Sequence, residues 1–307
     1  MSTQIAGVLP VVQTPFTEDG EIDLGALERE IDWVLDNGAD GVVMGMVSEV
    51  LRLASEERDA LAERLCRAAA SRGRTSVVSV GAESTHTALR HAKAAESAGA
   101  TAMMAIPPVT TTLGDGAVLD YYEQILAATR IPLVVQDASG YVGRPMSVEN
   151  QARMRNEFGS RVLFKPEAEP IGPSISALRD ATAGTAAVFE GSGGLGLIDN
   201  FRRGIAGTMP GADLSWATAR LWAALSGGDF DRAYRIHGRL VPLITLQTSL
   251  DSFVTVEKYL LHRQGILANT VCRGPAGYEL DAETRAEIDR LLEMLRDACG
   301  LQGHTSP

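Results

Sequence analysis

Short apolar runs alternate with amphipathic segments along the first two thirds of the chain. In the amphipathic segments apolar residues recur three and four positions apart, as in Leu24, Leu27, Ile31 and Val34, and this spacing predicts helices. The apolar runs between them are short and rich in Val, which predicts strands buried on both faces. We predict strands in the runs 5–16, 41–44, 76–80, 102–106, 132–136, 161–165, 186–190 and 204–208.

The number and order of these units favour one architecture. Buried strands joined by helices form parallel sheets, and eight such units are typical of a (β/α)₈ TIM barrel rather than an open sheet. The predicted fold class is therefore α/β. After Ala212 the pattern contains only helices, near 213–226, 229–246, 253–264 and 281–298. We expect a barrel over residues 1–211, and over 212–307 a C-terminal helical extension that packs on the barrel as one structural unit.

Turn and capping residues place the ends of several predicted helices. Asn37-Gly38 ends the first helix, because these residue types tolerate a left-handed backbone. Ser55 is expected to cap the next helix, which carries two glutamates in its first turn. Further helices are predicted over 85–97, over 117–129, from Ser147 onwards and over 174–181.

The balance of charge restricts the possible partners. The chain has 307 residues, with 28 Lys and Arg against 39 Asp and Glu, and a formal net charge of −11. Non-specific binding to nucleic acids or anionic membranes requires cations that neutralise phosphates, so an acidic chain argues against both. We expect a small-molecule substrate, no nucleic acid and no membrane.

The cysteines and histidines give no sign of a metal or redox centre. Cys66, Cys272 and Cys299 are widely spaced and form no C-x-x-C pair. His86 and His91 are expected to be exposed helix residues, and no histidine stands with acidic residues at ligand spacing. We therefore expect no cofactor and no metal. The N-terminus lacks the features of a signal peptide and no run of 18 apolar residues occurs, so a cytoplasmic protein is expected.

The barrel prediction turns residues at the strand ends into candidates, because active sites in this fold form at the C-terminal ends of the strands. Lys165 ends the sixth predicted strand, after three apolar residues. A lysine held against apolar walls has a lowered pKa, which frees its amine to attack a ketone. The other lysines, Lys93 and Lys258, fall on helices and are expected to be solvated or helix-end charges. The structural alternative for Lys165 is a salt bridge to Glu167 or Glu190.

Two glycine-containing turns at the predicted barrel mouth are candidates for binding an anion. In the turn 45–49, backbone N–H groups near Val47 and Ser48 could face a carboxylate. The second turn begins with Gly191 and Ser192 and could cradle an anion at a helix N-terminus. Its spacing matches neither G-x-G-x-x-G nor a P-loop, which argues against nucleotide binding. Ser48 has no obvious histidine partner, which argues against a hydrolase triad.

Several segments together resemble the dihydrodipicolinate synthase / N-acetylneuraminate lyase family of class I aldolase-type barrels. They are the opening 7–16 with the D-G and I-D pairs at 19–20 and 22–23, then 53–58, 228–233, 240–243 and 273–275. The resemblance covers nearly the whole chain. It implies that Lys165 is the Schiff-base lysine at the end of the sixth strand. It also implies association into a homo-oligomer, a dimer or a tetramer.

The departures from the family pattern fall on its proton relay. The relay tyrosine is replaced by Gln136, which Asp137 follows, and both threonine hydroxyls of the family's strand-2 motif are absent from 45–49. A glutamine amide is neither an acid nor a base near neutral pH. The arginine that binds a distal carboxylate in the synthase aligns with Tyr141, although Arg144 lies three residues further on.

Another group must therefore move protons. Glu167 beside the lysine and Glu190 at the end of the seventh strand are the acid–base candidates, since burial in the mouth would raise the pKa of either carboxyl. An ordinary ion pair with the lysine is the alternative for each. Glu49 is expected to be structural and to accept hydrogen bonds from loop amides. The candidate substrate-binding residues are Val47, Ser48, Gln136, Asp137, Tyr141, Gly191 and Ser192.

With this resemblance, the sequence indicates a Schiff-base-forming class I lyase, a dehydratase or an aldolase, that acts on a 2-oxo acid such as a 2-oxo-3-deoxy sugar acid. Lys165 would attack the 2-oxo group, and the imine would draw electrons from C3. Loss of a C3 proton would then expel the 4-hydroxyl group, or C3–C4 cleavage would release an aldehyde. Three alternatives stay open: a small-molecule-binding or regulatory barrel, a condensing enzyme like dihydrodipicolinate synthase with a changed proton relay, and a metal-dependent barrel aldolase.

Overall fold

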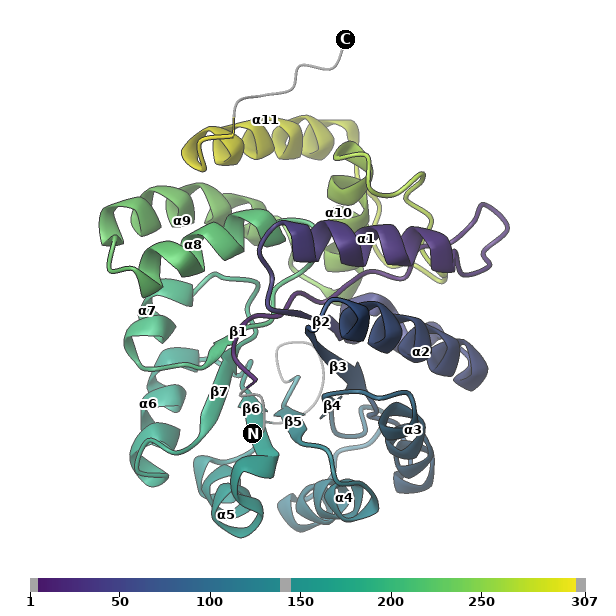
Figure 1. Cartoon of the computed structure of the whole chain (residues 1–307), viewed down its shortest axis with the longest axis vertical. Helices are drawn as coiled ribbons and strands as arrows, with labels where there is room; N and C mark the ends of the chain where they lie inside the picture. The colour runs from purple at the N-terminus through teal and green to yellow at the C-terminus, as the bar shows by residue number, and fades with distance from the viewer. Residues whose placement is uncertain (1–4, 139–144, 302–307) are drawn as a thin grey trace.

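The computed structural model describes residues 5–138 and 145–301, and in them eight parallel strands form one sheet. Neighbouring strands follow the order β1–β8–β7–β6–β5–β4–β3–β2. A parallel bridge between Val11 and Val43 joins the segment after β1 to β2 and closes the sheet into a barrel (Figure 1). The predicted (β/α)₈ barrel is confirmed. Its strands are β1 (Gly7–Val8), β2 (Gly41–Met44), β3 (Thr75–Ser79), β4 (Ala102–Ala105), β5 (Leu133–Gln136), β6 (Val162–Lys165), β7 (Ala187–Glu190) and β8 (Gly207–Thr208).

Helices surround the barrel, mostly where the sequence pattern predicts them. The prediction of Ser55 as a cap is wrong by one residue, because α2 begins at Ser55 and the backbone N–H of Ala54 donates to the Glu57 carboxylate at 2.8 Å. The short α7 was not predicted. The helices are α1 (Leu24–Asp36), α2 (Ser55–Ser71), α3 (Thr85–Ser97), α4 (Asp115–Ala128), α5 (Val148–Phe158), α6 (Ile171–Ala181), α7 (Leu197–Arg202), α8 (Ser215–Ser226), α9 (Phe230–Thr245), α10 (Leu250–Arg263) and α11 (Ala282–Ala298), with short 3₁₀ turns η1 (Met46–Ser48), η2 (Val50–Arg52) and η3 (Gly159–Arg161).

The core has two apolar layers, one inside the barrel and one between the strands and the helices. Successive side chains of a strand point to opposite faces, so each strand contributes to both layers. On β6, Leu163 belongs to the inner layer and Phe164 to the outer one. Lys165 follows in the inward direction. The alternation therefore places the amine of Lys165 at the mouth of an apolar barrel.

The last three helices lie together on one side of the barrel, beyond α8 and α1 (Figure 1). Helix α9 packs against both α8 and α11, while α10 packs against η1 at the C-terminal end of β2. The C-terminal helices are thus present as expected, and one of them reaches the barrel mouth. The division between residues 211 and 212 stays a prediction. Across residues 5–138 and 145–301, no helix is long and apolar enough to cross a membrane.

Candidate active site

Lys165 and Glu167 form a buried pair at the barrel mouth. Lys165 Nζ lies 3.1 Å from Glu167 Oε1, and both side chains are about 6% exposed. Burial raises the pKa of the Glu167 carboxyl, although the nearby Lys165 opposes this effect. Glu167 Oε2 is buried and has no hydrogen-bond partner in the described parts of the chain. The pair therefore places an amine beside a carboxyl group, one oxygen of which accepts no hydrogen bond from the described residues.

Two polar residues at the end of β5 hold Glu167 in place. The side-chain amide of Gln136 donates to Glu167 Oε1 at 2.8 Å, and the backbone N–H of Glu167 donates to Asp137 Oδ1 at 3.0 Å. Gln136 follows the inward-facing Val134 by two positions, so it shares the inner face of the barrel. The structure thus brings three sequence candidates, Gln136, Asp137 and Glu167, around the lysine. Gln136 orients the carboxyl group without transferring protons itself.

A cavity of about 40 Å³ opens beside the lysine, which is room for a few water molecules. Of the sequence candidates, Val47, Gln136, Lys165, Glu167 and Gly191 line it. Gly191 is required to be small, because a β-carbon there would lie 2.8 Å from Lys165 Cε and 3.0 Å from Glu167 Oε1. This close approach shapes the wall of the cavity.

Glu190 and Ser192 have a different environment. Glu190 follows the inward-facing Phe189, so its side chain turns to the other face of β7. Glu190 Oε1 accepts hydrogen bonds from the N–H groups of Ser192 and Gly194 at 2.7 and 3.3 Å, and Oε2 accepts the Thr208 hydroxyl at 2.7 Å. The Ser192 hydroxyl also binds Glu190. These contacts fold the loop after β7, and the structure does not bring either side chain into the lining of the cavity.

Ser48 is fully buried, and its polar groups have partners in the backbone. Its N–H donates to the Gly45 carbonyl at 3.1 Å, its hydroxyl donates to the Val12 carbonyl, and it accepts the N–H of Gly45 at 3.0 Å. Ser48 therefore shapes the turn η1, while its neighbour Val47 lines the cavity. Tyr141 and Arg144, the two other candidates near β5, lie outside the described residues.

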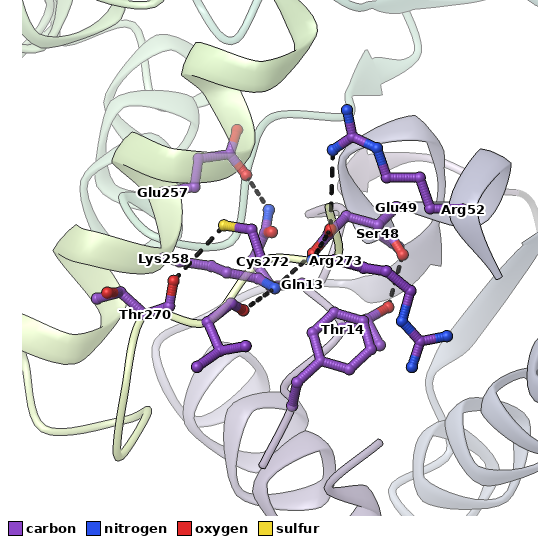
Figure 2. Close-up of polar contacts among 12 residues, drawn as sticks. Gln13, Thr14, Ser48, Glu49, Arg52, Glu257, Lys258, Thr270, Cys272 and Arg273 are labelled. Atoms are coloured by element: carbon purple, nitrogen blue, oxygen red, sulfur yellow. Dashed lines mark hydrogen bonds and ion pairs between the residues drawn. The ribbon is translucent and has the colours of Figure 1, made fainter. Parts of the chain in front are cut away.

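Lys258 corrects an expectation from the sequence. It was expected to be a solvated or helix-end charge, but it is 1% exposed on α10, and its ammonium binds the Glu49 carboxylate and, at 2.7 Å, the Val271 carbonyl (Figure 2). Its ammonium also lies 4.4 Å from the ring centre of Phe16. Glu49 accepts the backbone N–H of Arg273 at 2.7 Å, which confirms its structural role. Lys93 is exposed, as expected.

The sequence analysis missed the contribution of α10 to the cavity. Leu250, Phe253 and Glu257 of this helix line the cavity together with Met209, Pro210 and Gly211 after β8. A residue late in the chain carries no local sign that it reaches the barrel mouth, because only the packing of α10 on η1 brings it there. The helical periodicity of α10 could indicate a buried face, but not the partner of that face.

The histidines do not contribute to a metal site in the described parts of the chain. No group of three or more His, Cys, Asp or Glu residues there is arranged to hold a metal ion. The expectation of an exposed His91 is wrong, since this residue lies on the buried face of α3 and is 5% exposed. Burial, together with the charges of Arg58 and Arg90, lowers the pKa of His91 to about 4. His86 is exposed, as expected.

The comparison with protein families identifies one match. A sequence model of the dihydrodipicolinate synthetase family matches residues 4–295. L-2-keto-3-deoxyarabonate dehydratase of Azospirillum brasilense is 29% identical over 290 residues, which cover 92% of this chain and 92% of the relative. 4-Hydroxy-tetrahydrodipicolinate synthase of Chlorobium luteolum is 29% identical over 308 residues, which cover 96% of this chain and 99% of the relative.

The comparison with solved structures agrees with these sequence matches. The crystal structure of dihydrodipicolinate synthase from Rhodopseudomonas palustris superimposes with a TM-score of 0.84 at 27% identity. The match covers 96% of this chain and 99% of that chain. Barrel and C-terminal helices are therefore shared over nearly the whole length of both proteins.

Proposed function

Because this chain belongs to the dihydrodipicolinate synthetase family, we propose that it is a class I lyase that removes water from a 2-oxo-3-deoxy sugar acid through an imine on Lys165. The observation that carries this proposal is the buried contact of 3.1 Å between Lys165 Nζ and Glu167 Oε1. It supplies a nucleophilic amine and a proton-transferring group at one wall of the same cavity.

The proposed reaction begins at the lysine. The neutral amine of Lys165 attacks C2 of the 2-oxo acid, and loss of water gives an imine that carries a proton and a positive charge. The base Glu167 then removes a proton from C3, and the C–H electron pair moves into the imine to form an enamine. The enamine expels the C4 hydroxyl group as water, for which the protonated Glu167 returns the proton. Hydrolysis of the new imine releases the dehydrated 2-oxo acid and restores Lys165.

Because Gln136 cannot transfer protons, dehydration with Glu167 as the acid–base group is favoured over the tyrosine-dependent proton relay of the condensing enzymes. Gln136 stands where the family pattern has a proton-transferring tyrosine, and an amide cannot replace that function. A carboxyl group, however, can both accept and return a proton, and burial raises the pKa of Glu167 above its ordinary value. An elimination in which one carboxyl group handles both protons fits the groups that line the cavity.

Trapping with borohydride tests the imine directly. We expect incubation with pyruvate and borohydride to leave a 1-carboxyethyl group on Lys165, found by peptide mass mapping. Lys165→Ala should lose the adduct, whereas Lys93→Ala, at an exposed lysine of α3, should keep it. Absence of any adduct with pyruvate or other 2-oxo acids, together with unchanged turnover in Lys165→Ala, would falsify the proposal.

A panel of 2-oxo-3-deoxy pentonates and hexonates separates the remaining alternatives. Release of water without an aldehyde supports a dehydratase, and release of an aldehyde indicates an aldolase. Binding without turnover indicates a regulatory barrel, while loss of activity with a chelator and recovery with a divalent ion indicates a metal-dependent aldolase. The assembly into a dimer or tetramer also stays a prediction, which light scattering of the purified chain would test.

A further inference from the structure

Three carboxyl groups are buried together behind the candidate active site. Glu30 of α1, Asp213 after β8 and Glu257 of α10 are 0%, 3% and 2% exposed. Gln13 joins two of them, since its backbone N–H donates to Glu30 Oε1 at 2.8 Å and its side-chain amide donates to Glu257 (Figure 2). Glu257 Oε1 and Asp213 Oδ1 both lie within 2.6 Å of the position that a β-carbon on Gly211 would occupy. The two carboxyl groups thus approach each other across a glycine.

These three carboxyl groups have no directly paired cation among the described residues, although Lys165 and Lys258 lie near enough to act on Glu257 and Glu30. None of the ion pairs among the described residues includes Glu30, Asp213 or Glu257, whereas the nearby lysines pair with Glu167 and Glu49. Glu30 Oε2, Asp213 Oδ2 and Gln13 Oε1 are buried without a hydrogen-bond partner in the described part of the chain. Ionising several carboxyl groups of one buried site is costly when no cation pairs with them directly, so the site favours retention of a proton.

The electrostatic surroundings agree with this geometry. Burial raises the pKa of Glu30 to about 8 and also raises that of Asp213. Burial raises the pKa of Glu257 as well, and Asp213 and Glu30 add to the effect, while Lys165 opposes it from β6. The surroundings of Glu257 therefore favour its neutral form.

Glu257 is the member of the group that lines the cavity of Lys165. An ionised carboxylate at this wall would repel an anionic 2-oxo acid, and the repulsion would be strong at short range in a partly buried site. A neutral carboxylic acid at the same position donates its O–H to an oxygen of the ligand instead. The protonation of Glu257 therefore decides whether this wall attracts or repels the substrate.

We propose that Glu257 is a specificity-determining residue, which faces the 2-oxo acid as a neutral carboxylic acid and keeps its proton because Asp213 and Glu30 share its buried site. The proposal rests on the proposed function, since it needs an anionic 2-oxo acid beside Lys165. The charged groups that face Glu257 are Asp213 from the loop after β8, Glu30 from α1 and Lys165 from β6, and Glu167 lines the same cavity. The test therefore compares variants with the unmodified chain.

The test measures the pyruvate concentration that gives half-maximal borohydride trapping at Lys165, between pH 6 and pH 9. In the unmodified chain this concentration should rise about tenfold or more as Glu257 ionises. Glu257→Gln keeps the shape and a hydrogen-bond donor but cannot become charged. In this variant, the half-maximal pyruvate concentration should therefore no longer rise with pH by the amount due to Glu257. Asp213→Asn removes the neighbour that makes ionisation of Glu257 costly, so the rise should begin at lower pH.

A second variant tests the hydrogen bond, and thermal unfolding checks that each variant is folded. Glu257→Leu has no donor, so at pH 6 it should need about tenfold more pyruvate than the unmodified chain. If Glu257→Gln keeps the original pH dependence, or if Glu257→Leu is trapped like the unmodified chain at pH 6, the proposal is wrong. If the unmodified chain shows no adduct at Lys165 at any pH, the proposed function fails first and this inference falls with it.

Discussion

At the scale of single residues, the arrangement around Glu167 is the basis for proposing this carboxyl group as the acid–base group. Gln136 and Asp137 fix the orientation of Glu167, and Lys165 lies against one of its two oxygens. The second oxygen is buried without a hydrogen-bond partner in the described chain, and Glu167 lines the cavity beside Lys165. Burial raises the pKa of this carboxyl group, which favours its protonated form.

Replacing Glu167 should therefore separate imine formation from turnover. We expect Glu167→Gln to keep borohydride trapping of pyruvate at Lys165 and to lower kcat for a 2-oxo-3-deoxy acid by about 10²- to 10⁴-fold, because an amide cannot transfer the C3 proton. Steady-state kinetics and mass mapping measure the two effects. Glu63→Gln, at an exposed carboxyl of α2, is the control and should leave both unchanged. Turnover retained in Glu167→Gln would exclude Glu167 as the proton-transferring group.

The sequence predicted much of this residue-scale picture, for identifiable reasons. Lys165 and Gln136 follow apolar strand residues, and two-residue alternation places both inside the barrel mouth. The same alternation directs Glu190 away from the mouth, and its contacts with Ser192, Gly194 and Thr208 occupy both of its oxygens. These contacts favour Glu167 over Glu190 for proton transfer, and both roles stay predictions. Strand alternation alone already indicates that Glu190, next to the inward-facing Phe189, lies on the other face of β7.

At the scale of elements, the position of α10 at the cavity could not be predicted from the local sequence pattern. It brings Glu257 to the cavity, and its neighbour Lys258 binds Glu49 at the turn between η1 and η2. Helical spacing predicted a helix near 253–264, but the partner of its buried face lies more than 200 residues earlier in the chain. Contacts over such separations depend on the assembled fold, so only the structure could reveal them.

The contact between α10 and the η1–η2 turn should be important for stability. Glu49 is 3% exposed and adopts a left-handed backbone with φ 58°. Without Lys258, the ion pair left to this buried carboxylate among the described residues is the longer one, 3.9 Å, to Arg52. We expect Lys258→Met to lower the free energy of unfolding by about 3–5 kcal/mol in urea titrations. The double variant Lys258→Met/Glu49→Gln should recover part of this loss.

The matched control is Lys93→Met, which changes an exposed lysine on α3 and should alter the free energy of unfolding by less than about 0.5 kcal/mol. Equal stability of Lys258→Met and Lys93→Met would show that the buried pair does not stabilise the turn.

At the scale of the whole molecule, the buried carboxyl groups make stability depend on pH in an unusual direction. The pKa of Glu30 rises from 4.5 to about 8 on folding, so between these values the folded chain binds more protons than the unfolded chain. Stability contributed by this group must then fall as pH rises through that window. His91 acts in the opposite sense between about pH 4 and 6.5, because its pKa is lowered.

The difference between the unmodified chain and Glu30→Gln isolates the contribution of Glu30. We expect the variant to gain about 3–4 kcal/mol of stability relative to the unmodified chain as pH rises from 5 to 8. Urea unfolding at several pH values measures this difference. Glu63→Gln should show no such trend, and a flat difference for Glu30→Gln would mean that Glu30 is ionised in the folded chain.

The wall that α10 adds to the cavity also has a consequence for the order in which the protein becomes functional. Synthesis proceeds from the N-terminus, and the strands with Lys165 and Glu167 leave the ribosome long before residues 250–257 exist. A nascent chain that ends after β8 has its nucleophile but lacks the side chains that close the pocket and the lysine that neutralises Glu49. The cavity therefore gains its last wall only late in translation. A chain released before residue 250 would lack Leu250, Phe253 and Glu257, and its cavity would be open on that side.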